Sequence, residues 1–96
     1  MTQRKFDEGM IQELYRALVK MESEADCASL LEDLCTRKEV EQMAQRLRAA
    51  RLLMEGKTYT QVIEQTNISS ATLSRVSRCV QYGEGYRKFV TPEDKS

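Results

Sequence analysis

Residues that interrupt helices are scarce in this chain. Its one proline is at position 92, and its four glycines occupy positions 9, 56, 83 and 85. Because a helix interior tolerates proline and glycine least of all residues, the long stretches between them favour helices. We therefore expect an all-α fold in one globular domain of residues 1–96, with 41% hydrophobic residues to supply its core.

Apolar residues recur at steps of three and four along two helices expected near the N-terminus. The first, over residues 7–21, carries the stripe Phe6, Met10, Leu14, Leu18 and Met21, widened by Ile11, Tyr15 and Val19. The second, over residues 23–34, carries Cys27, Leu30, Leu31 and Leu34. These stripes suit a core and a dimer interface equally, because a chain this short can also bury apolar surface by oligomerising.

Helix-capping side chains mark the start of the next helix. Thr36 and Glu39 have the spacing of a capping box, which predicts a helix over residues 37–55 with Gly56 directly after its end. The residues expected on its buried side are Val40, Met43, Ala44, Leu47 and Met54. A short helix over residues 86–90 and a frayed tail after it complete the expected elements.

Between these helices lies a second set of capping signals. The segment Thr58-Tyr59-Thr60-Gln61 is another capping box and predicts a short helix over residues 59–66. Asn67 tolerates the left-handed backbone conformation, which suits a tight turn. Ser69 is a good N-cap for a helix over residues 70–81.

Two short helices joined by such a turn are typical of the DNA-reading helix-turn-helix, which we assign to residues 58–78. Its expected buried side consists of Val62, Ile63, Ile68, Leu73 and Val76. The residues expected to face DNA are Tyr59, Thr60, Ser69, Ser70, Ala71, Thr72, Ser74, Arg75 and Arg78. Small hydroxyl side chains let a helix lie deep in the major groove, and the arginines add charge for the phosphates.

The net charge of zero hides an uneven distribution. Residues 1–45 carry six Lys and Arg against ten Asp and Glu, whereas residues 46–88 carry eight against three. A basic half beside an acidic half fits a surface that meets a polyanion.

The sequence offers little for catalysis or metal binding. It has no histidine, and its cysteines, Cys27, Cys35 and Cys79, are widely spaced without a CxxC pair. Without the commonest general base and zinc ligand, we expect neither an enzyme nor a metal site. Scattered cysteines favour a reducing cytoplasm over a disulfide framework. No apolar run approaches the roughly 18 residues of a membrane span, and no secretory signal is visible, so we expect a cytoplasmic protein.

Taken together, several segments resemble the Trp repressor family, in particular its YerC/YecD branch. These segments are DLCT at 33–36, AQRL at 44–47, ARLL at 50–53, EGKTY at 55–59 and SATLSRVSRC at 70–79. The resemblance implies an all-helical, intertwined homodimer in which the helices of residues 7–34 from two subunits interlock. It also implies two recognition helices that read successive major grooves of a palindromic operator in double-stranded DNA.

The resemblance extends to the ligand pocket of the family, with differences. Arg46 and Arg75 fall at the positions of two arginines that sandwich the indole ring of tryptophan, and Thr36 matches a threonine near the ligand carboxylate. Val76 replaces a glycine that leaves room for the ring, and Cys79 replaces a serine that helps to hold the ligand. Because a β-branched side chain should obstruct the ring, we expect no cofactor. The two arginines would then serve DNA phosphates or ion pairs between subunits, and another small effector stays open.

Three functions follow from these observations. The leading hypothesis is a dimeric, sequence-specific DNA-binding transcriptional regulator that acts as a repressor. The second is a repressor of the same fold that needs an amino acid or a similar small anion as corepressor. The third is a protein-interaction module that has kept the fold without DNA binding, which the near-zero net charge favours. Steep weakening of DNA binding by salt separates the first from the third.

Overall fold

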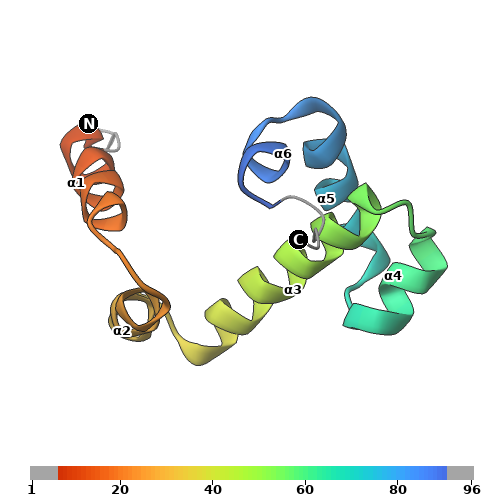
Figure 1. Ribbon diagram of the computed structural model, residues 1–96, viewed down its shortest axis with the longest axis horizontal. Helices are drawn as coiled ribbons and strands as arrows, with labels where there is room; N and C mark the ends of the chain where they lie inside the picture. Colours follow the sequence, from red (N-terminus) through yellow and green to blue (C-terminus); the bar gives the residue numbers. More distant parts are fainter. Residues whose placement is uncertain (1–6, 91–96) are drawn as a thin grey trace, which may run out of the picture. The chain divides into compact units, whose positions relative to one another are not determined.

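A computed structural model describes residues 7–90 and shows a helical chain (Figure 1). Within these residues the helices are α1 (Glu8–Val19), α2 (Glu24–Leu34), α3 (Arg37–Met54), α4 (Tyr59–Thr66), α5 (Ser70–Tyr82) and α6 (Gly85–Phe89). The all-α prediction is confirmed, and each helix ends close to its expected limits. Phe6 and the predicted tail of residues 91–96 lie outside the described residues.

The chain divides into two compact units, residues 1–36 and residues 37–96. The described part of the first unit holds α1 and α2, and that of the second holds α3 to α6. Over residues 7–90, none of these helices combines the length and the apolar character that crossing a membrane requires.

The helices of the first unit are well capped but bury nothing. The side chain of Asp7 accepts a hydrogen bond from the Gly9 amide at 2.8 Å, and that of Ser23 accepts one from the Asp26 amide at 3.0 Å. Neither α1 nor α2 contains a buried residue. The predicted apolar stripe is thus only partly covered within this unit: Met10 is 59% exposed, whereas Leu18 and Met21 are half-buried.

The core lies in the second unit, where α4, α5 and α6 pack against α3 (Figure 1). Its buried apolar residues are Ala49, Ala50, Leu52, Val62, Ile68, Leu73 and Val76. Leu53, Ile63, Val80 and Tyr86 are partly buried against this cluster. The predicted buried side of the two short helices and their turn is therefore confirmed, with Ile63 only partly covered.

The expected buried side of α3 was partly wrong. Ala44 is exposed and Leu47 is 49% exposed, while the other three predicted residues, Val40, Met43 and Met54, are half-buried. The fully buried positions of α3 lie instead between residues 49 and 52. The reason is that α4 and α5 cover only the C-terminal half of α3, so that its first half contributes nothing to the core.

The centre of this core can be tested with one substitution. Leu73→Ala should lower the free energy of unfolding by about 2–5 kcal/mol, because Leu73 has no exposed surface and its truncation leaves a cavity. Tyr82→Ala on the same helix is the control, since Tyr82 is 80% exposed and should cost less than about 0.5 kcal/mol. Both values come from urea denaturation, and equal costs would contradict this description of the core.

Candidate nucleic-acid interface

The start of α4 is fixed by a reciprocal pair of hydrogen bonds. The Thr58 hydroxyl accepts from the Gln61 amide at 3.1 Å, and the Gln61 side-chain oxygen accepts from the Thr58 amide at 2.9 Å. This confirms the predicted capping box. Tyr59 and Thr60, which the sequence placed at the interface, lie in the first turn of α4 and are exposed. The helix therefore presents its N-terminal end and these two side chains to solvent.

A three-residue turn joins α4 to α5 and has the predicted left-handed residue. Asn67 adopts φ 63° and ψ 19°, and its amide donates to the Ile63 carbonyl at 2.8 Å. The Thr66 hydroxyl donates to the Val62 carbonyl at 2.7 Å and accepts from the Ile68 amide at 3.2 Å. Ile68 is buried in the core. The turn is therefore fixed by hydrogen bonds to its backbone and by the packing of the Ile68 side chain.

A contact from α3 that could not be predicted from the sequence holds the same turn. The side-chain amide of Gln45 donates to the Thr66 carbonyl at 2.9 Å. The two residues are 21 positions apart in sequence, so no local pattern indicates the bond. It satisfies a carbonyl at the C-terminus of α4, where intrahelical partners run out.

Ser69 begins α5 as the predicted N-cap. Its hydroxyl accepts from the Thr72 amide at 3.2 Å and also donates to the Thr72 hydroxyl at 3.0 Å. Because the Thr72 oxygen already accepts this bond, its own hydrogen is left to donate elsewhere. Thr72 is half-buried, so its hydroxyl lies between the exposed side and the buried side of α5.

The two faces of α5 differ sharply in burial. One face carries Leu73, Val76 and Ser77, all buried. The other carries the remaining residues that the sequence placed at the interface, all exposed: Ser70, Ala71, Ser74, Arg75 and Arg78. These exposed positions follow the helical repeat and form one continuous surface, which we call the α5 face.

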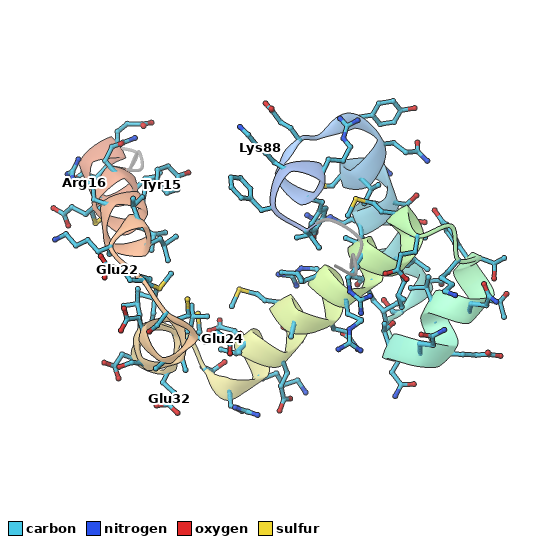
Figure 2. The ribbon with its side chains drawn as sticks, viewed as in Figure 1. Tyr15, Arg16, Glu22, Glu24, Glu32 and Lys88 are labelled. Atoms are coloured by element: carbon cyan, nitrogen blue, oxygen red, sulfur yellow. The ribbon has the colours of Figure 1, made fainter. Side chains whose placement is uncertain are left out.

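Positive charge gathers in the second unit. Residues 37–90 carry ten Lys and Arg against five Asp and Glu, a balance of +5. Residues 7–36 carry two against eight, and Figure 2 shows Glu22, Glu24 and Glu32 projecting from this acidic unit. In the described residues, ion pairs form at Arg37–Glu41 and Arg51–Glu55, so Arg75 and Arg78 keep their charge free of an acidic partner.

A small cleft of about 140 Å³ opens beside the α5 face. It is lined by Arg46, Thr72, Arg75, Val76, Cys79 and Tyr86. Of the four residues that the sequence predicted for a ligand pocket, the structure brings together Arg46, Arg75 and Cys79. Thr36, the fourth, belongs to the first unit.

Thr72, which was predicted only to face DNA, also lines the cleft, and Tyr86 is the lining residue that the sequence did not indicate. It belongs to α6, a helix of five residues, which is too short to show an apolar repeat. Val76, which the resemblance placed in the pocket, lines the cleft and is 2% exposed. Over residues 7–90, no group of three or more Cys, Asp or Glu side chains is placed to hold a metal ion.

Comparison with known proteins agrees with this architecture. The family model described as Trp repressor protein matches residues 10–93. This chain belongs to the Trp repressor family. The uncharacterized protein YerC of Bacillus subtilis (strain 168) is 40% identical over 73 residues, which cover 76% of this chain and 70% of YerC.

Two solved structures of the Trp repressor type share the fold. A candidate Trp repressor from Staphylococcus aureus is 34% identical, with a TM-score of 0.79 over 82% of this chain and 80% of that one. A TrpR-like protein from Eubacterium eligens ATCC 27750 is 33% identical, with a TM-score of 0.80 over 83% and 84% of the two chains. Bacterial relatives thus share the all-helical fold across most of its length.

The turn before α5 gives a test of how this interface is positioned. Asn67→Ala should lower the free energy of unfolding by about 1 kcal/mol, because an L residue with a β-carbon pays for the left-handed conformation. Asn67→Gly should leave it unchanged or raise it slightly, since glycine adopts positive φ freely. Glu64→Ala, at an exposed position of α4, serves as the control in the same urea titrations. Equal losses in the alanine and glycine variants would show that the Asn67 side chain, and not the backbone, matters.

Proposed function

We propose that this protein is a dimeric, sequence-specific DNA-binding repressor of transcription, in which α4, the turn and α5 form the helix-turn-helix of residues 58–78. The observation that carries the proposal is the α5 face, which exposes small and basic residues while the opposite side of the helix is locked into the core. The major groove of B-DNA admits one α-helix, so a rigid helix of this kind can read base edges.

The chemistry of the α5 face suits both base reading and phosphate binding. Ser70 and Ser74 offer hydroxyl groups that bond to either kind of base edge, and Ala71 suits the methyl group of thymine. Arg75 and Arg78 supply charge for the DNA backbone. Thr72, whose oxygen already accepts from Ser69, has a free hydrogen to donate to a phosphate or a base acceptor.

The first turn of α4 extends the contact to the phosphates. Tyr59 and Thr60 are exposed beside free amide groups of the helix N-terminus, which favour an anion. Arg46, at the cleft next to Arg75, has no acidic partner among residues 7–90 and adds a further cation. We propose that both arginines serve DNA phosphates.

The cleft supports a corepressor function less well. It places two arginines together, as a small anion would require, but its volume of about 140 Å³ is below the roughly 300 Å³ at which ligand pockets begin. A cavity of about 150 Å³ holds a benzene molecule, and indole is larger than benzene. Tryptophan is therefore a poor fit for the cleft.

The exposed apolar residues of the first unit support the dimer. α1 and α2 have no buried residue, and Met10 and Val19 of α1 are 59% and 80% exposed. Apolar surface of this kind marks an interaction site. We propose that the helices of residues 7–34 interlock with those of a second copy, which would set two α5 helices on successive major grooves.

DNA reading by α5 is tested with a double variant. With an operator selected from a random DNA library, Thr72→Ala combined with Arg75→Ala should reduce affinity to the non-specific level, a loss of about 10³-fold or more. Arg75 belongs to the α5 face, Thr72 is half-buried beside it, and neither is part of the core cluster, so helix content and oligomeric mass should stay unchanged. Gel-shift titration measures the affinity, and wild-type binding should weaken steeply between low and moderate salt.

The matched control removes a charge elsewhere in the same unit. Arg37→Ala takes an exposed arginine from the first turn of α3, where it pairs with Glu41 at 3.3 Å. Its operator affinity should stay within a few-fold of wild type. Operator affinity that is unchanged in the double variant would sink the assignment of α5 as the recognition helix.

Dimer formation is tested on the stripe of α1. Wild-type protein should have twice the 11.1 kDa mass of one chain in light scattering at micromolar concentration. Leu14→Asn places a polar group in the apolar stripe and should shift the mass towards 11.1 kDa. Arg16→Asn introduces the same residue on the other side of α1 and should leave the dimer intact. A wild-type chain that is monomeric under these conditions argues against the dimer.

A further inference from the structure

α6 directs one side chain towards the rest of its unit. Arg87, Lys88 and Phe89 are exposed, and Figure 2 shows Lys88 on the side of α6 that faces away from α5. Tyr86, in contrast, is half-buried, packs against the core cluster and lines the cleft. The short helix therefore brings a phenol ring to the cleft and leaves its other long side chains in solvent.

The return of the chain from α5 to α6 is closely constrained. A β-carbon at Gly83 would lie 2.9 Å from the Cys79 carbonyl oxygen, closer than side chains come to a backbone atom. Only glycine fits here without a shift of the backbone. The Arg87 guanidinium then donates to the Gly83 carbonyl, and α6 packs against both α5 and α3. The position of Tyr86 is thus built into the fold.

The two arginines that line the cleft together with Tyr86 could bind a small aromatic acid. Guanidinium groups such as those of Arg46 and Arg75 stack on aromatic rings and bind carboxylates. Tyr86 lines this cleft beside the two arginines, and the space that they enclose is only about 140 Å³. One wall of the cleft is thus an aromatic ring that belongs to the chain itself.

We propose that Tyr86 is a built-in occupant of the cleft, which takes the place of a small aromatic effector and holds α5 ready for DNA without one. This inference rests on the DNA-binding function proposed above. The link between cleft and DNA is direct, because Arg75 and Thr72 line the cleft and also belong to the DNA-facing residues of α5.

Chemical rescue tests this inference. Tyr86→Ala removes the phenol ring and keeps the β-carbon. p-Cresol is the same ring with one extra methyl group, for which the adjoining cleft of about 140 Å³ leaves room. We expect Tyr86→Ala to lower the melting temperature and to weaken operator binding by about tenfold or more. Millimolar p-cresol should restore both measurements towards their wild-type values. Neither p-cresol nor tryptophan at the same concentration should shift the melting temperature or operator affinity of the wild-type protein.

Phe89→Ala is the matched control, because it removes an 80% exposed aromatic ring from the same helix. It should behave as wild type with and without p-cresol. Stabilisation of the wild-type protein by tryptophan or p-cresol would overturn the inference, as would a Tyr86→Ala variant that binds operator normally. If Tyr86→Ala does not fold, Tyr86→Leu takes its place. It should fold and bind operator more weakly than wild type, and normal binding would again overturn the inference.

The two proposals fail in different ways. If wild-type protein selects no DNA at all, the repressor function is wrong, whereas the melting temperatures with and without p-cresol still decide whether Tyr86 fills the cleft. If DNA binding is normal in wild type but p-cresol rescues nothing in Tyr86→Ala, the function stands and the inference about Tyr86 is wrong.

Discussion

The close packing of α4 and α5 on Ala49 and Ala50 of α3 determines where every other feature of the second unit lies. Neither alanine has any exposed surface, and their small side chains leave room for Val62 and Leu73, which are fully buried in the same cluster. Protein interiors are packed so densely that the loss of one methylene group is felt. The α5 face therefore has a fixed orientation relative to α3, as a helix that reads base edges requires.

The helix caps and the turn could be predicted because they depend on local contacts, whereas contacts between distant residues could not. The caps at Thr58 and Ser69 and the left-handed Asn67 depend on partners within four residues, so their spacing in the sequence was sufficient. The Gln45 bond to the Thr66 carbonyl spans 21 positions and left no such signal. The exposure of Leu47 was missed because an apolar repeat shows that a helix has an apolar side, but not how far along the helix its neighbours cover it.

The near-zero net charge favoured a protein-interaction module. It is a weak argument against DNA binding, because the positive and negative charges belong to different units. The balance of zero is the sum of an acidic first unit and a basic second one. Salt screens charges beyond roughly 8–10 Å, so a phosphate at the α5 face responds to the arginines nearby and not to the total. Arg75 and Arg78 lack acidic partners among residues 7–90, so their charge is available at that face.

The cleft matters because Arg75 and Thr72 line it and are also among the residues that we propose to face DNA. A ligand shifts a conformational equilibrium only as far as its affinities for the two states differ. A side chain that belongs to the folded chain reaches the cleft without the loss of translational and rotational freedom that opposes the binding of a free molecule. A free aromatic molecule would have to overcome that loss in order to displace Tyr86. If Tyr86 occupies the cleft in this way, the position of α5 does not depend on the concentration of a free aromatic molecule.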